Sequence, residues 1–235
     1  MICIVCGKSV RKFDQMDIIG DDLSDKWKLT TKERFLFDQR ETTFCPYCRS
    51  SLRDRILAEA IIKTPKPEAN LIEWVKNNQN LKVAEINSCG SLHKYFKRLS
   101  CLSYSEFKSK DLLRNLYNKY ILRVRCENIM DLNYPDNYFD LVLHSETLEH
   151  VSDPVKALGE CQRVLKKGGC CIFTIPVIKR RTTKYVCDNN SYHGNRNSKD
   201  YLVFWEFGGD FLSRNKIRYA AGDEKRLCSS YLIKK

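Results

Sequence analysis

The hydrophobic pattern of the chain alternates between two periods. Short apolar runs typical of buried strands occur at 82–86, 101–104, 121–125, 139–144 and 170–175. Apolar residues recur at helical spacing over 52–62, 71–76, 92–98 and 155–165. Because helices separate the strands at 82–86 and 101–104 and those at 139–144 and 170–175, the pattern predicts an α/β fold in which a parallel sheet carries helices on both faces.

Glycine residues indicate where the later elements end. The pair Gly168–Gly169 is expected to stop the last of these helices ahead of the last of these strands. Beyond it, 216–220 and 228–233 are expected to pair as a hairpin that closes the sheet, with Gly222–Asp223 in the turn.

Two prolines predict a boundary between modules. The stretch Thr64-Pro65-Lys66-Pro67 cannot continue a helix, because proline lacks an amide donor and restricts the residue before it. We therefore expect a linker at 64–70 that separates an N-terminal module, 1–63, from a larger domain, 71–235. A length of 235 residues fits one main domain with a small appendage.

The composition is that of a globular protein that folds without disulfides. Hydrophobic residues make up 43% and charged residues 30%, and no stretch approaches the roughly 18 apolar residues of a membrane helix. The first residues lack the basic start, apolar segment and cleavage site of a secretion signal. Twelve cysteines spread along the chain fit buried or metal-bound thiols. We therefore expect a cytoplasmic protein with no membrane partner.

The formal net charge of +12 raises the question of a nucleic-acid partner, since Lys and Arg neutralise phosphates. The basic residues are scattered, and 179–181 is the only tight run. No basic stripe alternates with stacking aromatic residues. Nucleic-acid binding is therefore an alternative that the pattern does not favour.

Four cysteines form two CxxC pairs, Cys3-Ile-Val-Cys6 and Cys45-Pro-Tyr-Cys48. Each pair can present two thiolates to one ion at tetrahedral spacing, and Gly7 supplies the permissive backbone that such a turn needs. Unrelated buried cysteines and a redox CxxC are the alternatives, but two pairs together favour zinc. Because the protein would supply all four ligands, we expect a structural Zn²⁺ that holds the module folded.

The residues around these cysteines add two expectations. Ser50 and Ser51 stand where they can cap the helix at 52–62. The long insert between the pairs carries aromatic side chains that are expected to pack beside the metal, namely Trp27, Phe35, Phe37 and Phe44.

The strongest motif begins at Asp136 and reads Asp-Asn-Tyr-Phe-Asp-Leu-Val-Leu-His-Ser-Glu-Thr-Leu-Glu-His-Val. It continues through Asp153-Pro154 to the run Arg-Val-Leu-Lys-Lys-Gly-Gly that ends at Gly169. This stretch resembles the class I (Rossmann-like) S-adenosylmethionine-dependent methyltransferases. A wider set of motifs is similar to a type 11-like subfamily with an N-terminal zinc module: Cys45-Pro-Tyr-Cys48, Tyr104-Ser-Glu-Phe107, Cys126-Glu-Asn128, the run from His144 to His150, Tyr192-His-Gly194 and Phe204-Trp-Glu-Phe-Gly208. The resemblance covers nearly the whole chain, most specifically 104–176. It implies a Rossmann-like seven-stranded sheet and S-adenosylmethionine as cofactor.

By this resemblance, the stretch Val-Ala-Glu-Ile-Asn-Ser-Cys-Gly-Ser at 83–91 occupies the place of the glycine-rich turn that approaches the methionine part of the cofactor. Asn87, Cys89 and Ser91 stand where glycine is usual, and Gly90 is displaced by one position. Asn adopts positive φ, and Ser and Cys are small, so we expect the turn to persist.

The resemblance also assigns the remaining cofactor contacts. Glu106, at the end of the second strand, would bind the ribose hydroxyls, and Asn128 or the adjacent Glu127 would accept a bond from the adenine amino group. The full set of implied cofactor residues is Glu85, Asn87, Cys89, Gly90, Glu106, Phe107, Glu127, Asn128, His144 and Ser145.

Methyl transfer requires alignment and shielding more than a covalent residue, but a base helps when the acceptor is a hydroxyl or an amine. The candidate catalytic residues are Glu146, His150 and His193. A loop-fixing role for His150 and a turn at His193 are the alternatives.

The segment 176–207 is expected to form a substrate lid, because it follows the fifth strand and is polar. Its basic residues Arg180, Arg181 and Lys184 suit an anionic substrate or a solvated surface. Three functions stay open: methyl transfer to a small-molecule or glycan-like acceptor, methyl transfer to RNA or protein guided by the zinc module, and a non-catalytic binding domain.

Overall fold

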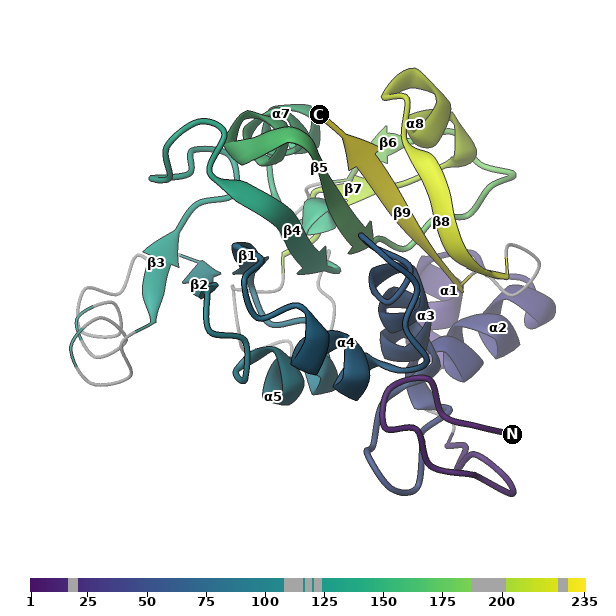
Figure 1. The fold of residues 1–235 in the computed structure, drawn as a ribbon. Coiled ribbons are helices and arrows are strands. Elements are labelled where there is room, and N and C mark those ends of the chain that lie inside the picture. The colour runs from purple at the N-terminus through teal and green to yellow at the C-terminus, as the bar shows by residue number, and fades with distance from the viewer. Residues whose placement is uncertain (17–20, 108–115, 117–119, 121–123, 187–201, 224–227) are drawn as a thin grey trace. The chain divides into compact units, whose positions relative to one another are not determined.

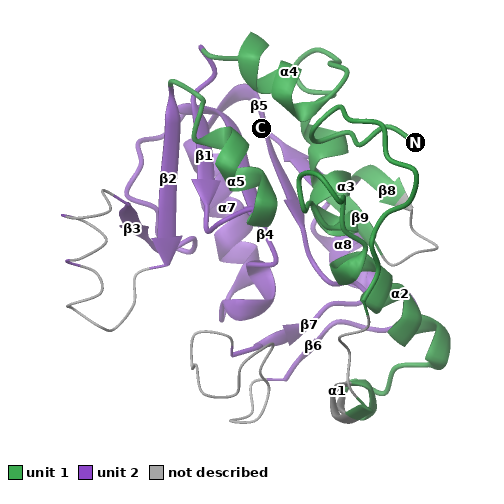
Figure 2. Cartoon of the chain, turned by 90° about the horizontal axis from the view of Figure 1, so that it is seen from below, with its two compact units in different colours: residues 1–79, 90–100, 219–231 green, residues 80–89, 101–218, 232–235 purple. Residues whose placement is uncertain are grey.

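The computed structural model describes residues 1–16, 21–107, 116, 120, 124–186, 202–223 and 228–235. The chain forms two compact units (Figure 2). Unit 1 comprises 1–79, 90–100 and 219–231, and unit 2 comprises 80–89, 101–218 and 232–235. Each unit therefore combines segments that contact one another but are not contiguous in the chain. The expected linker at 64–70 stays a prediction.

The main sheet has seven strands in the order β3-β2-β1-β4-β5-β9-β8 (Figure 1). The first five to appear along the chain are β1 (Val83–Ile86), β2 (Leu102–Phe107), β3 (Arg125–Glu127), β4 (Phe139–Ser145) and β5 (Leu165–Thr174). The pairings among these five strands are parallel. The predicted α/β class and seven-stranded sheet are therefore confirmed.

The core of unit 2 lies around β4, whose Leu141, Val142 and Leu143 are buried, as expected for a parallel strand that is covered on both faces. The helix α7 (Pro154–Val164) follows β4 in the chain, and Asp153 caps it by accepting a bond from the Lys156 amide at 2.9 Å. Its buried positions recur at helical spacing and pack against β5: Ala157, Leu158, Cys161 and Val164.

The glycine pair Gly168–Gly169 corrects one expectation. The helix α7 ends at Val164 and β5 begins at the next residue, so the pair lies inside β5 and does not separate the two elements. The register between β4 and β5 shifts at this point. Gly168 has a φ of +85°, and a Cβ on Gly169 would meet the Asp140 carbonyl oxygen at 2.9 Å. The two glycines therefore permit an irregular backbone within β5 and do not end a helix.

The last two strands are β8 (Arg218–Asp223) and β9 (Cys228–Lys234), which neighbour each other in the sheet as predicted. Gly222–Asp223 belongs to β8, so these residues do not form the turn. Residues 224–227, between the two strands, lie outside the described residues.

The structure describes part of 176–207, the segment expected to form the lid, and this part belongs to unit 2. The short strands β6 (Lys184–Tyr185) and β7 (Trp205–Glu206) pair antiparallel as a separate sheet. The 3-10 turn η3 (Leu148–His150) precedes α7, and α8 (Gly209–Arg214) follows β7. Residues 187–201, with the candidate base His193, lie outside the described residues.

Unit 1 contains the helices α1 (Asp21–Lys26), α2 (Thr31–Thr42), α3 (Leu52–Ile61), α4 (Leu71–Asn77) and α5 (His93–Phe96), with a 3-10 turn η1 (Gly90–Leu92) before α5. Ser51 caps α3 in a box with Asp54, as the position of that serine predicted. Thr30 and Glu33 form a second box at α2. None of the described helices has the length and apolar content of a membrane span.

The aromatic side chains of the insert divide into two groups. Trp27 packs edge-on against Phe37 with ring centroids 5.9 Å apart, and the Arg49 guanidinium lies 5.0 Å from the centre of the Phe44 ring. Phe35 is 52% exposed. Phe35 is therefore not enclosed by neighbouring side chains, and the expectation that these rings pack beside the metal stays a prediction.

Candidate functional site

The two CxxC pairs come together in unit 1. The sulfur atoms of Cys3 and Cys48 lie 3.8 Å apart, and those of Cys6 and Cys45 lie 3.9 Å apart. All four sulfur atoms lie within 4.8 Å of one another. A zinc tetrahedron with Zn–S bonds of about 2.3 Å has sulfur–sulfur edges of about 3.8 Å. The cluster therefore has the donor set and spacing that one Zn²⁺ requires.

Two cations lie beside this cluster. Arg55, on α3, is buried and donates to the carbonyl oxygens of Thr43 and Ser50 at 3.0 and 2.8 Å. Burial lowers the pKa of Arg55, and the charges of the cluster thiolates oppose that shift. Lys94 donates from Nζ to the Cys48 carbonyl oxygen at 2.6 Å. Four thiolates around Zn²⁺ leave two net negative charges, which these cations can offset.

The first turn of α3 also holds the residues that follow Cys89. The Asp54 carboxylate accepts from the Ser51 amide at 3.1 Å and from the Ser91 hydroxyl at 2.7 Å. A Cβ on Gly90 would lie 2.8 Å from Asp54 Oδ1, and Gly90 has a φ of +62°. Glycine is therefore required at 90 for two reasons, backbone conformation and space. Asp54 was not among the predicted site residues.

The strand order places a ligand crevice in unit 2. Successive strands run outwards from β1 to β3 on one side and from β4 to β5 on the other, so the order reverses between β1 and β4. Ligands of open α/β sheets bind at such a reversal, outside the carboxyl ends of the strands. The residues that end β1, β2 and β4 therefore face the candidate site.

The turn after β1 keeps its shape without the usual glycines. Asn87 has a φ of +57°, and its amide donates to the Ser105 carbonyl oxygen at 2.8 Å. The buried Glu85 carboxylate accepts from the Cys89 amide at 2.8 Å. Asn87 thus takes the left-handed conformation as expected, because Asn tolerates positive φ better than most residues.

The end of β2 carries an accessible carboxylate. Glu106 is partly exposed and accepts a bond from the Tyr104 hydroxyl. Phe107, the last residue of the strand, is 53% exposed. These residues lie one strand away from the Asn87 turn, because β1 pairs with β2.

The end of β3 holds its polar side chains in local bonds. Glu127 is 3% exposed, pairs with Arg125 at 3.2 Å and accepts from the Asn133 amide at 2.9 Å. Asn128 Oδ1 accepts from the Met130 amide at 3.0 Å. Both oxygen acceptors predicted for the adenine amino group are thus engaged within the loop that follows β3.

The end of β4 combines a buried bond with a left-handed residue. The Ser145 and Thr174 hydroxyl oxygens lie 2.8 Å apart, across the β4 and β5 pairing. Glu146 follows with a φ of +48°, and its amide donates to the Thr174 carbonyl oxygen at 3.0 Å. A non-glycine residue held in this conformation is costly and is enriched at functional sites.

His144 is placed away from the strand ends. Its side chain is fully buried and stacks on Phe173 with ring centroids 4.8 Å apart. Burial lowers the pKa of His144 to about 3, so the ring is neutral. The structure therefore gives no support to its predicted contact with the cofactor.

His150 fixes a loop. Its Nδ1 lies 2.9 Å from the Leu202 carbonyl oxygen, so Nδ1 carries the proton and donates. Its Nε2 lies 3.9 Å from the buried Glu149 carboxylate. The Phe204 amide donates to the Glu149 carbonyl oxygen at 2.7 Å, which joins the same two segments. These bonds favour the loop-fixing alternative over a role as catalytic base.

Protein stability is expected to depend on pH through His150. Burial lowers the pKa of this ring, while its bond to Leu202 and the charge of Glu146 oppose the shift. The unfolded ring, with a pKa of about 6.5, therefore binds a proton more readily than the folded ring. The free energy of unfolding should fall with decreasing pH below about 6.5, by at most about 1.4 kcal/mol per pH unit. His150→Gln should flatten this dependence in urea titrations from pH 7.5 to 5, whereas an unchanged slope would contradict the assignment.

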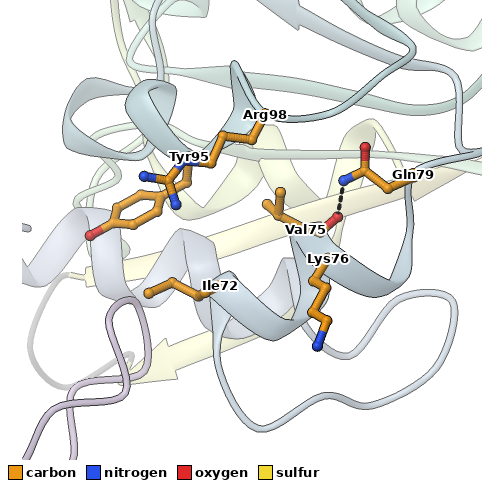
Figure 3. A pocket seen from close by; sticks show the side chains of 6 residues that line it. All are labelled: Ile72, Val75, Lys76, Gln79, Tyr95 and Arg98. Carbon is orange, nitrogen blue, oxygen red and sulfur yellow. Dashed lines mark hydrogen bonds between the residues drawn. The ribbon is translucent and has the colours of Figure 1, made fainter.

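A shallow pocket of about 150 Å³ lies in unit 1 between α4 and α5 (Figure 3). Its lining is mostly apolar and includes two cationic side chains. The lining residues are Ile72, Val75, Lys76, Gln79, Tyr95 and Arg98. None of these is a predicted cofactor or catalytic residue. The pocket is therefore separate from the strand-end site.

Comparison with known proteins agrees with this geometry. Residues 86–173 match the family model described as "Methyltransferase domain". An uncharacterized protein of Methanocaldococcus jannaschii is 43% identical over 67 residues, which cover 28% of this chain and 29% of that protein. The ubiquinone/menaquinone biosynthesis C-methyltransferase of Pectobacterium carotovorum is 41% identical over 69 residues, covering 28% and 27%. The chain thus spans less than a third of either relative.

A solved structure of a methyltransferase from Aquifex aeolicus is 16% identical, covers 68% of this chain and 86% of its own, and superposes with a TM-score of 0.37. The family match begins at the last residue of β1 and spans β2, β3, β4, α7 and most of β5. Over residues 86–173, which are fewer than half of the chain, this protein is similar to methyltransferase domains.

Proposed function

We propose that this protein transfers a methyl group from S-adenosylmethionine to a hydroxyl or amine of a small-molecule or glycan-like acceptor. The observation that supports this most directly is the turn after β1. Asn87 takes a positive φ there, and the Glu85 carboxylate holds the Cys89 amide. A turn of this shape allows close approach of a ligand to the backbone, even though the usual glycines are missing.

The residues at the strand ends have distinct roles in this proposal. Glu106 accepts hydrogen bonds from the two ribose hydroxyls, since a carboxylate has acceptors only and each hydroxyl can donate. Phe107 offers an exposed apolar surface beside the nucleoside. The turn after β1 contacts the methionine part. When bound, the cofactor supplies a sulfonium from which the methyl group departs.

Glu146 is the proposed general base. It is partly exposed and directly follows β4 at the reversal of strand order. Its backbone has a left-handed conformation. A carboxylate in this place can take the proton that a hydroxyl or a neutral amine loses as the methyl group is transferred to it. His150 contributes by fixing the loop after Glu146, through its bond to the Leu202 carbonyl oxygen.

The four clustered cysteines are proposed to hold a structural Zn²⁺. Support comes from the sulfur–sulfur distances and from the buried Arg55 beside the thiolates. A site with four protein ligands leaves no position for substrate, so its contribution is to the stability of unit 1. The ion would also set the position of the Cys48 carbonyl, to which Lys94 is bonded.

Glu106→Ala is expected to weaken S-adenosylmethionine binding by about 10- to 100-fold, because the variant loses charge-assisted bonds worth roughly 1.5–3 kcal/mol. Isothermal titration calorimetry of the purified full chain would measure the change. Circular dichroism melting should be nearly unaffected, since the carboxylate is partly exposed.

Tyr104→Phe is the matched control, because it removes the hydroxyl that donates to Glu106 but keeps the carboxylate. Its effect on affinity should be smaller than that of the alanine variant. Equal S-adenosylmethionine affinity of the wild type and Glu106→Ala would show that Glu106 does not bind the ribose. If the wild-type chain shows no S-adenosylmethionine binding at all, the domain is a non-catalytic one.

A further inference from the structure

A second group of metal-ligand side chains lies in unit 2, apart from the four N-terminal cysteines. His144 comes from β4, Cys161 from α7 and Cys171 from β5. One ligand atom of each lies within 4.8 Å of the other two, and all three residues are buried. β4 pairs with β5, and α7 packs against β5.

The sheet register explains why these side chains meet. Phe173 pairs with His144, and Cys171 pairs with Val142, two residues earlier on β4. Side chains two residues apart on a strand share a face, and paired residues of neighbouring strands do as well. His144, Phe173 and Cys171 therefore share one face. Cys161 belongs to the buried stripe of α7, which packs against β5.

The imidazole of His144 is the unusual member of the group. It is fully buried, and neither ring nitrogen has a hydrogen-bond partner among the described residues. A buried polar group without a partner costs free energy, and native cores rarely contain one without a reason. Stacking on Phe173 fixes the plane of the ring but satisfies neither nitrogen. A bond from one nitrogen to a metal ion would do so.

The thiols point to the same explanation. The sulfur atoms of Cys161 and Cys171 lie within 4.8 Å of each other, and both residues are fully buried. Soft sulfur ligands with imidazole select zinc among the common divalent ions. Two thiolates, a neutral imidazole and Zn²⁺ sum to zero charge. A neutral complex avoids the cost of an isolated charge in the core.

We propose that His144, Cys161 and Cys171 form a second, buried zinc site that ties β4, β5 and α7 together. Three protein ligands leave one position of a four-coordinate ion, which a water molecule or another small ligand fills. The site shares no residue with the four-cysteine cluster. It also uses no residue to which the proposed methyl transfer gives a role, because the buried His144 is no longer among the proposed cofactor contacts.

The zinc content of the full chain tests this proposal. Protein expressed with added zinc and purified under reducing conditions is expected to carry two zinc ions per chain by elemental analysis. Cys171→Ala and Cys161→Ala should each lose one of them. Cys170→Ala is the matched control, because Cys170 is also buried but neighbours Cys171 and therefore lies on the opposite face of β5. It should keep both ions.

A measurement on the wild-type chain covers the case in which these variants fail to fold. X-ray absorption at the zinc edge should give an average of fewer than four sulfur ligands per ion, with a nitrogen shell from His144. One zinc per chain with four sulfur ligands would overturn the proposal. So would a folded Cys171→Ala variant that retains two ions. Loss of the four-cysteine zinc in Cys45→Ser would leave this second ion in place.

Discussion

Gly90→Val is expected to lower S-adenosylmethionine affinity more than tenfold and to destabilise the protein by about 2–4 kcal/mol. The backbone at Gly90 has a φ of +62°, a conformation that a β-branched residue adopts only under strain. In addition, its Cβ would lie 2.8 Å from Asp54 Oδ1, and bonds to Ser51 and Ser91 hold that carboxylate. The turn that follows β1 would therefore have to move. Calorimetric titration and urea unfolding measure the two effects.

Gly159→Ala is the control for this substitution. Gly159 lies inside α7, and a Cβ there meets nothing within 4 Å. Alanine should therefore raise the free energy of unfolding by up to about 1 kcal/mol, through helix propensity alone, and leave cofactor affinity unchanged. A Gly90→Val variant that binds the cofactor as tightly as wild type would show that the turn does not contact it.

Cys45→Ser should abolish zinc binding at the four-cysteine cluster and unfold much of unit 1. Metal binding in small zinc modules contributes on the order of 10 kcal/mol to folding, because the ligands are not assembled in the unfolded chain. Loss of one thiolate weakens the site and also removes a buried partner of the cluster. Hydrogen exchange measured by mass spectrometry should show lost protection in α3 and in the segment around Lys94, which is bonded to Cys48.

Cys101→Ser provides the comparison, since Cys101 is an exposed cysteine that belongs to no cluster among the described residues. Its zinc content and exchange pattern should match those of wild type. Zinc-free protein with wild-type protection in α3 would contradict a structural role for the metal.

The repeating elements of the sheet could be predicted because burial imposes a visible period. The stripe of α7 and the apolar run of β4 follow from the requirement that a parallel strand be covered on both faces. The clustering of the four cysteines could also be predicted, because two CxxC pairs have the spacing typical of metal ligands. Asn87 was correctly expected to replace glycine, because few other side chains tolerate positive φ.

Contacts between residues distant in the chain could not be predicted in this way. Asp54 carries the signature of a helix cap, and nothing in its sequence position shows that its second oxygen binds Ser91. His144 lies in a motif that suggested a ligand at a strand end, but side-chain alternation along β4 directs it into the core. Gly168–Gly169 shows a further limit, because helix ends and irregular strands favour the same residue.

The discontinuity of unit 1 has a consequence for the order in which the protein forms as it leaves the ribosome. Its three segments are 1–79, 90–100 and 219–231. In the last of them, the Ser230 hydroxyl donates to the Ile56 carbonyl oxygen at 3.2 Å, a link that spans 174 positions. Residues 1–79 emerge before the other two segments, yet the packing of unit 1 is complete only after residues 219–231 have been synthesised. If the cysteine pairs bind a metal ion early, residues 1–79 would gain a local fold that does not depend on the contacts with 219–231.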